Sequence, residues 1–316
     1  MALDADTLVD RRRLKRRVSL WRFAAVVAVG LALFAILNKG IYHTGAHVAR
    51  IDISGIITDD QVQQELIAQI AENDNAKALI LRIDSPGGTT TGAEALYEAV
   101  RKAAEKKPVV AVLGTIAASG GYIAALSADH VVARGNTLTG SIGVLFQWAQ
   151  FNELLDKIGI EMRDVKSAPL KAEPNPFNKP SPQALRAVKD LVDSSFDWFV
   201  GLVAERRGLS LEEARKLGDG RVYTGWQAVG NGLVDEIGGE DAARAWLAAE
   251  HDIDVDLPTE DWQPDNGGLA IGGFGTRAAQ ALGAGIATGL AEKTLGAKRL
   301  TLDGLVSLWH PEPLQN

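Results

Sequence analysis

The chain has 316 residues, of which 46% are hydrophobic and 23% are charged, and its formal net charge is −7. This composition is that of a globular protein with room for one large domain or two small ones, and it excludes disordered and fibrous chains. The acidic balance gives no reason to expect a nucleic-acid partner. Cysteine is absent and the five histidines have no paired spacing, so we expect neither a metal site nor a cofactor.

The N-terminal region predicts a membrane anchor. Residues 1–17 end in a basic run, and residues 18–38 are apolar apart from Ser19, Arg22 and their last residues. Twenty helical residues rise about 30 Å, enough to cross the hydrocarbon core. Basic flanks stay on the cytoplasmic side, so we expect the chain after about residue 40 to lie across the membrane. A cleaved signal peptide is the alternative, but no small-x-small site closes the apolar run.

The stretch that follows predicts alternating strands and helices. Apolar runs indicate strands over 47–57, 78–84 and 130–134 and in the first part of 109–123, and amphipathic patterns indicate helices over about 60–73, 91–106 and 182–207. Strands separated by helices predict a parallel sheet with its functional residues at the carboxyl ends of the strands. Two glycine-rich turns, at 85–88 and 119–121, fall at such ends.

Ser119 stands where a buried strand gives way to small residues. The run Ala117-Ala118-Ser119-Gly120-Gly121 has the steric pattern of a nucleophile elbow, in which a sharp strand-to-helix turn presents a hydroxyl. A helix that begins directly after the serine would aim its amide dipoles at the group under attack. A simple turn or helix cap is the other interpretation of the same residues.

A serine nucleophile needs a base, and no histidine has an obvious place for that role. His130 begins a strand, and the other histidines lie near the anchor or the tail. Lys171 is the remaining candidate because it lies in a proline-containing loop, 166–182, with few charges nearby. Its pKa would have to fall by roughly three units from about 10.4, through desolvation. A solvent-exposed loop lysine is the alternative interpretation.

Gly87 and Gly88 are candidates for stabilising an oxyanion. Their backbone N–H groups lie at the end of a predicted strand, with no side chain in the way. A phosphate cradle is the competing use of such glycines. It is disfavoured because the sequence has neither GxxxxGK[ST] nor a proper GxGxxG.

Five motifs in order resemble the signal peptide peptidase A family of serine peptidases, over about residues 46–245. The motifs are Asp84-Ser85-Pro86-Gly87-Gly88, Ala117-Ala118-Ser119-Gly120-Gly121-Tyr122, Leu138-Thr139-Gly140-Ser141-Ile142-Gly143-Val144, Lys166-Ser167 with Lys171, and Asp219-Gly220-Arg221-Val222-Tyr223-Thr224-Gly225. The resemblance implies an α/β fold of the crotonase/ClpP-like type and degradation of remnant signal peptides in the bacterial inner membrane. The single-unit length resembles the short form, whose members form ring-shaped homo-oligomers with sites completed by neighbouring protomers.

Transferred residue by residue, the resemblance implies four roles. Ser119 would be the nucleophile, Lys171 the general base, Gly88 the oxyanion donor and Ser141 a hydroxyl that positions the lysine. The family usually has a glycine after the serine of the lysine loop, where this chain has Ala168-Pro169. This departure puts the backbone path of the loop in doubt.

The expected partners are hydrophobic peptides bound as an added strand, and the membrane itself, with the catalytic domain on the periplasmic side. A crotonase-like acyl-CoA enzyme would use oxyanion glycines without Ser119 or Lys171. A non-catalytic membrane scaffold of the same fold would tolerate the loss of both. Residues 246–316 form a C-terminal extension to which the sequence assigns no chemistry.

Overall fold

The computed structural model describes residues 18–30, 45–264 and 306–308. Residues 18–30 form a helix with exposed apolar side chains. Within the described ranges, no helix is both long and apolar enough to cross a membrane. Residues 31–38 of the predicted anchor and the basic segment 1–17 lie outside the described residues. The compact unit that carries the candidate site contains residues 45–264 and the strand at 306–308.

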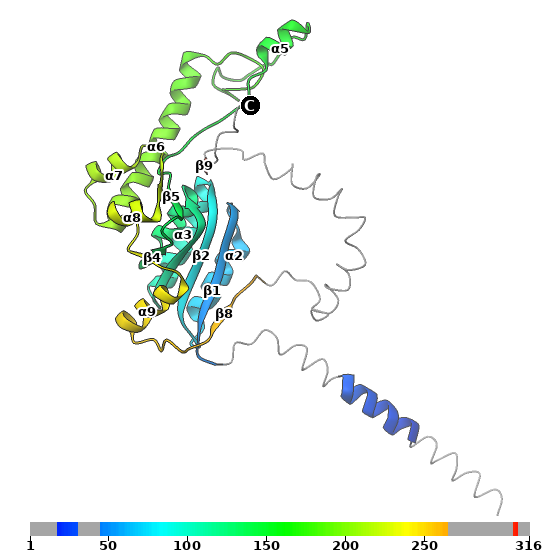
Figure 1. The fold of residues 1–316 in the computed structure, drawn as a ribbon. Coiled ribbons are helices and arrows are strands. Elements are labelled where there is room, and N and C mark those ends of the chain that lie inside the picture. Colours follow the sequence, from blue (N-terminus) through cyan, green and yellow to red (C-terminus); the bar gives the residue numbers. More distant parts are fainter. Residues whose placement is uncertain (1–17, 31–44, 265–305, 309–316) are drawn as a thin grey trace, which may run out of the picture. The chain divides into compact units, whose positions relative to one another are not determined.

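One mixed sheet forms the centre of this unit (Figure 1). Its strands are β1 (His47–Ile57), β2 (Ala76–Thr89), β3 (Val109–Ala118), β4 (His130–Ala133), β5 (Leu138–Gly140), β6 (Val222–Thr224), β7 (Glu236–Ile237), β8 (Thr259–Asp261) and β9 (Val306–Leu308). The main path runs β6-β5-β3-β2-β1-β8, with β4 beside β3 and β7, and β9 beside β2. The pairs β1–β2, β2–β3, β3–β4 and β3–β5 are parallel, while β2–β9 and β5–β6 are antiparallel. The prediction of an α/β fold with parallel central strands is confirmed.

Helices cover both faces of the sheet. They are α2 (Gln61–Glu72), α3 (Thr90–Ala104), α4 (Gly120–Leu126), α5 (Asn152–Lys157), α6 (Pro182–Arg207), α7 (Leu211–Leu217), α8 (Gly225–Gly230) and α9 (Glu240–His251). Leu79 and Leu81 of β2 belong to the core shared with α2, α3 and α4, whereas Ala78 and Ile80 belong to the core shared with α9. Because β2 is buried on both faces, its sequence is a continuous apolar run rather than an alternation.

β2 continues five residues beyond its predicted end. We expected a strand over 78–84 followed by a turn over 85–88, but the strand runs to Thr89. The buried Ser85 hydroxyl donates to the Gly55 carbonyl (2.6 Å) and accepts from the Gly87 N–H (3.1 Å). These bonds lie at the register shift after which Gly87 and Gly88 pair with the end of β1. The glycines are therefore part of a bent strand end rather than a loop.

Residues 150–195, which we call the arm, project from this body. The arm consists of α5, the loop that follows it and the N-terminal part of α6, and Figure 1 shows it beyond the ends of the strands. Its loop is closed by a hydrogen bond from the Phe151 N–H to the Pro176 carbonyl (2.7 Å). None of the residues of α5 is buried, and every buried residue of α6 except Ala184 lies between Phe199 and Val203. The arm is thus attached at the C-terminal half of α6.

Candidate active site

Ser119 occupies a strained turn between β3 and α4. Its φ is 57° and its ψ is −116°, a backbone conformation that residues other than glycine rarely adopt. Its N–H donates to the Gly140 carbonyl (2.8 Å), and its carbonyl accepts from the Tyr122 N–H (2.9 Å). The residue is 1% exposed. The order of strand, sharp turn and helix is the one that the small residues predict.

The small residues around Ser119 are required by close backbone contacts. A Cβ on Gly121 would lie 2.6 Å from the Ser85 carbonyl oxygen, so the first turn of α4 packs directly on β2. Gly140 has a φ of 82°, which a residue with a side chain seldom adopts. Contact between backbones leaves Ser119 little freedom to move.

Gly88 lies at the carboxyl end of β2, the strand next to β3. A Cβ at this position would lie 1.8 Å from the carbonyl oxygen of Ile57 on β1, so no other residue fits without a shift of the backbone. Ser85 of β2 is the register partner of Ala117 on β3. Gly88 and Ser119 therefore follow paired positions at the same edge of the sheet.

Ser141 reaches the same edge from β5. Ala118 of β3 pairs with Gly140 of β5, so Ser119 and Ser141 are the next residues on two adjacent strands. Ser141 has a φ of 49°, is 7% exposed, and donates its N–H to the Arg221 carbonyl (2.8 Å). The ends of β2, β3 and β5 thus bring together Gly88, Ser119 and Ser141.

Three supporting side chains were not predicted from the sequence. The buried Tyr122 hydroxyl donates to the Leu233 carbonyl (2.8 Å), and burial raises the pKa of this phenol, so it stays a neutral donor. The Thr139 hydroxyl donates to the Ala117 carbonyl (2.7 Å), joining β5 to β3. Arg206 of α6 donates to two carbonyls at the C-terminal end of α4 (both 2.9 Å). Tyr122 stands out as the one large polar side chain among the small residues of its motif.

Lys171 lies on the arm, in the loop between α5 and α6. Its side chain is exposed, and its N–H donates to the Ala168 carbonyl (3.1 Å). Nearby Lys166 contacts Asp164 (2.9 Å) and Glu173 (2.5 Å), and hydrogen bonds to these two carboxylates raise its pKa. Among the described residues, Lys171 forms no ion pair with a carboxylate. The structure therefore places the predicted base on the arm and the predicted nucleophile on the body.

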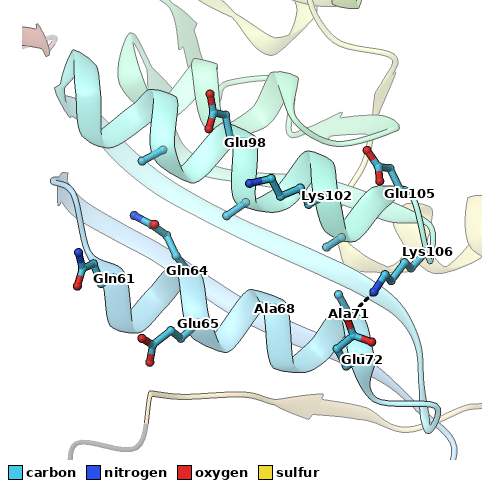
Figure 2. Close-up of a pocket in the computed structure, with 13 residues that line it drawn as sticks. Gln61, Gln64, Glu65, Ala68, Ala71, Glu72, Glu98, Lys102, Glu105 and Lys106 are labelled. Atoms are coloured by element: carbon cyan, nitrogen blue, oxygen red, sulfur yellow. Dashed lines mark hydrogen bonds and ion pairs between the residues drawn. The ribbon is translucent and has the colours of Figure 1, made fainter.

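A cavity of about 590 Å³ lies between α2 and α3 (Figure 2). Alanines line it, among them Ala68, Ala71 and Ala99, and charged residues surround its rim, including the ion pair of Lys106 with Glu72. None of the four predicted site residues borders it. The described part of the chain also holds no cluster of three or more histidine and carboxylate side chains placed to bind a metal ion.

The three strand ends carry the elements of a serine hydrolase site. A strained serine lies at a strand-to-helix turn, and a glycine N–H lies at the end of the neighbouring strand. The sequence model of Peptidase family S49 matches residues 101–254, and that of Clp protease matches residues 39–137. The match to family S49 includes Ser119, Ser141 and Lys171, while the match to Clp protease includes Gly88 and Ser119.

Relatives in other organisms agree with this class. The Synechocystis sp. protein "Putative protease slr0021" is 37% identical over 214 residues, which are 67% of this chain and 77% of that protein. The Enterococcus faecium protein "Putative signal peptide peptidase SppA" is 32% identical over 253 residues, covering 74% of this chain and 72% of that protein. Protease 4 of Haemophilus influenzae is 36% identical over 211 residues, covering 62% of this chain and 34% of that protein. The chain belongs to peptidase family S49, the signal peptide peptidase A family of serine peptidases.

Proposed function

We propose that this serine peptidase is a membrane-anchored endopeptidase that hydrolyses remnant signal peptides with a Ser119–Lys171 dyad. The observation that carries the proposal is the strained, buried Ser119 at the end of β3, with the Gly88 backbone at the end of the adjacent β2. A strand-end serine with a nearby main-chain donor suits attack on a peptide carbonyl and stabilisation of the resulting oxyanion.

In the proposed reaction the neutral amine of Lys171 accepts the proton of the Ser119 hydroxyl as the oxygen attacks the peptide carbonyl. The Gly88 N–H donates to the oxyanion of the tetrahedral intermediate. The C–N bond then breaks, and the lysine ammonium returns the proton to the departing amine. Water, deprotonated by the same lysine, hydrolyses the acyl-enzyme ester and regenerates Ser119. Ser141 positions the lysine ammonium by accepting a hydrogen bond.

We further propose that neighbouring protomers of a ring complete each site. Lys171 lies on the arm, which also exposes large apolar side chains in number: Phe151, Leu154, Ile158, Ile160, Met162, Val165, Leu170, Phe177, Leu185 and Leu191. An exposed apolar surface of this kind marks an interaction site. Burial of the arm against a second protomer would desolvate Lys171, and desolvation is what allows a lysine to act as a base.

The N-terminal segment supports the proposed membrane location. The helix at 18–30 exposes Leu20, Trp21 and Phe23, and the apolar sequence that continues to residue 38 has the length of a membrane span, about 30 Å. The basic residues before it favour a cytoplasmic N-terminus, with the peptidase domain on the periplasmic side of the inner membrane. Hydrophobic signal peptides released in that membrane would then be local substrates.

The test is hydrolysis of a fluorogenic signal-peptide-like peptide by the full-length protein in detergent. We expect Ser119→Ala and Lys171→Ala each to reduce kcat by about 10⁴-fold or more, since members of a catalytic unit fail together. Lys179→Ala is the matched control, because Lys179 is another exposed lysine of the same loop, and it should retain wild-type activity.

Each competing hypothesis about the function predicts a different result. Full activity of Lys171→Ala would assign the base to another residue. Failure of the folded wild type on all peptides would favour a non-catalytic membrane scaffold. Turnover of acyl-CoA that survives Ser119→Ala would favour crotonase-like chemistry. Circular dichroism of every variant verifies that losses do not come from unfolding.

A further inference from the structure

The loop between α5 and α6, which carries Lys171, has charged side chains inside and apolar side chains outside. From residue 156 to residue 172 every residue is exposed except Lys166. The exposed residues include five large apolar side chains, Ile158, Ile160, Met162, Val165 and Leu170. The side chains of Lys166 and Glu173, in contrast, are only 18% and 13% exposed. Charged side chains normally lie at the surface and apolar ones in the interior, so polar contacts rather than an apolar core hold this loop in shape.

Glu173 is the centre of these polar contacts. Its Oε1 accepts hydrogen bonds from the Lys166 ammonium (2.5 Å) and from Nδ2 of Asn175 (3.0 Å). Asn175 in turn accepts, through its Oδ1, from two backbone N–H groups that follow it (both 2.9 Å). Side-chain hydrogen bonds therefore connect the two flanks of the segment 167–172.

Lys171 lies on the short turn that these contacts close. The Lys171 N–H donates to the Ala168 carbonyl (3.1 Å), and the Glu173 N–H donates to the Leu170 carbonyl (3.3 Å). Ala172, between Lys171 and Glu173, has a φ of 59°, which residues with a side chain seldom adopt. A strained residue persists only where its surroundings hold it. The direction of the Lys171 side chain thus depends on a backbone conformation that the contacts of Glu173 support.

The charge of Glu173 also bears on an amine two residues away. Its second oxygen, Oε2, is buried and accepts no hydrogen bond within the described part of the chain. Because water does not reach this oxygen, the carboxylate relies on the Lys166 ammonium for compensation. Hydrogen bonds to Asp164 and Glu173 raise the pKa of Lys166, so this lysine stays charged. A carboxylate without its cation would favour the protonated form of a nearby amine.

The remaining charges of the loop lie in water. They are the exposed side chains of Glu161, Arg163, Asp164, Lys171 and Lys179. Solvent and salt screen such charges. Among the described residues of the loop, Lys166 and Glu173 form the only ion pair in which both side chains are largely covered.

We propose that Glu173 is a positioning residue for the Lys171 base and is held in that role by its ion pair with Lys166. This inference rests on the proposed function, since it takes Lys171 to be the base. The pair closes the turn that presents Lys171, and the Lys166 ammonium offsets a carboxylate that favours the protonated, inactive amine. Neither side chain accepts a proton in the reaction or touches the substrate.

The first experiment tests the geometric role by peptide hydrolysis with the full-length protein in detergent, each variant at its own optimal pH. Glu173→Ala removes both contacts of Oε1, and we expect kcat to fall about ten- to a hundredfold with little change in KM. Glu173→Gln keeps an oxygen that accepts from Lys166 and Asn175, so it should retain kcat within about threefold. Glu161→Ala removes an exposed carboxylate of the same loop and is the control. Equal kcat for Glu173→Ala and the control would overturn the geometric role.

The second experiment tests the charge role without catalysis. Labelling with acetic anhydride over a range of pH at low ionic strength, followed by peptide mass spectrometry, reports how much of the Lys171 amine is neutral. Lys166→Met leaves Glu173 without its cation, and we expect the labelling curve to move to higher pH by about 0.5 to 1 unit. Glu173→Gln should move it to lower pH by a smaller amount, since Asp164 still pairs with Lys166. The double variant should return the curve to near that of the wild type, because both charges are gone.

The two experiments separate failure of this proposal from failure of the proposed function. Opposite shifts, together with the loss of kcat in Glu173→Ala, support the positioning role. Curves that move in neither variant overturn the charge role, even where Ser119→Ala and Lys171→Ala are inactive and the proposed function stands. Full activity of Lys171→Ala, or a wild type that hydrolyses no peptide, refutes the proposed function and the positioning role with it. Circular dichroism verifies the fold of each variant, and Glu173→Gln carries the charge test alone if Lys166→Met does not fold.

Discussion

The strand-end region and the arm differ in how firmly the chain holds them. At the strand ends, Ser119 and Ser141 are buried, and their backbones are hydrogen-bonded to Gly140 and Arg221. On the arm, Lys171 is exposed, and α5 has no buried residue. One region is fixed by backbone packing within a single chain, whereas the other has little of its own surface covered.

This difference bears on how a Ser-Lys site could be regulated. A nucleophile in a strained turn has to be held at all times, because the surrounding backbone must support its unfavourable conformation. A lysine that remains in water keeps its charge, and desolvation converts it to a base. We therefore expect the strand ends to be preorganised and the arm to supply activity only when something covers it.

The largest predicted effect is complementation between two inactive variants. If the dyad forms between protomers, Ser119→Ala and Lys171→Ala copies assembled in one ring should regain activity, because an intact serine can meet an intact lysine. Random 1:1 assembly would restore about a quarter of the wild-type sites. The measurement is hydrolysis by co-expressed, differently tagged variants purified through both tags.

A dyad formed within one chain gives the opposite result. Every protomer of the mixed ring would then lack one catalytic group, and the mixture would be as inactive as either variant alone. Co-expressed wild type and Ser119→Ala, purified in the same way, is the control for mixing.

The next prediction concerns Gly88, where the preorganised region has the least space. Gly88→Ala would bring a methyl group against the Ile57 carbonyl, so we expect a loss of about 3 kcal/mol in the free energy of unfolding. We also expect kcat to fall, because the donor N–H would shift. Gly201→Ala should instead stabilise the protein by about 1 kcal/mol, since that helical glycine has open space around it. Urea unfolding of both variants gives the comparison, and equal stabilities would contradict it.

Ser85 should act on the reaction through Gly87 and Gly88. Ser85→Ala removes the donor to Gly55 and the acceptor for the Gly87 N–H, and we expect a loss of about 2 kcal/mol in stability. As a positioning residue it should lower kcat more than it raises KM, which a purely structural role would not require. Ser54→Ala removes an exposed hydroxyl from the neighbouring strand and should change neither constant. A Ser85→Ala variant with wild-type kcat would refute the positioning role.

The smallest predicted effect is the pH dependence of stability at the C-terminal end of α6, where Arg207 forms an ion pair with Asp235 (2.6 Å). Burial opposes ionisation of Asp235, but hydrogen bonds from Arg207 and from the Val131 N–H outweigh it and lower the pKa of this carboxyl. The folded pKa lies below the unfolded value near 3.9. The carboxylate therefore contributes its full stability above about pH 4 and loses it as the pH falls through the folded pKa.

Asp235→Asn isolates this contribution. The variant should unfold at lower urea concentration than wild type at pH 7, and the gap between the two midpoints should narrow between about pH 4 and pH 2. A gap that stays constant down to pH 2 would show that the charge of Asp235 does not stabilise the fold.

Sequence reasoning was most accurate where local signals set the boundaries. α6 has its predicted ends, because Ser181 caps a helix with proline in its first turn and Gly208 ends it with a φ of 62°. The predicted end of β2 was wrong, because a serine and two glycines are usually turn residues. Here the hydrogen bonds of the Ser85 hydroxyl to Gly55 and Gly87 hold these residues in the strand. α5 was missed, since a six-residue helix with no buried residue leaves no apolar period.

The candidate site likewise has features that local sequence signals predict and features that they do not. That Gly88 and Ser119 share an edge follows from the parallel order of the strands, so local patterns were enough to predict it. The backbone contact between Gly88 and Ile57 and the bond from Tyr122 to Leu233 join residues far apart in sequence. No local pattern encodes such contacts. The roles of Ser119, Lys171, Gly88 and Ser141 remain predictions, and the variants above test the first three.

The attachment of α6 turns the arm into a lever. Its pivot is where Arg206 donates hydrogen bonds to two carbonyls at the end of α4, and α6 rises about 36 Å from there to its first residue, Pro182. A tilt of about five degrees at the pivot would move the first residue of α6 by about 3 Å, several times the tolerance of about 0.5 Å within which catalytic groups must be held. A single attachment cannot hold the tip of the arm within this tolerance. Accurate placement of Lys171 therefore requires a second contact at the far end of the arm.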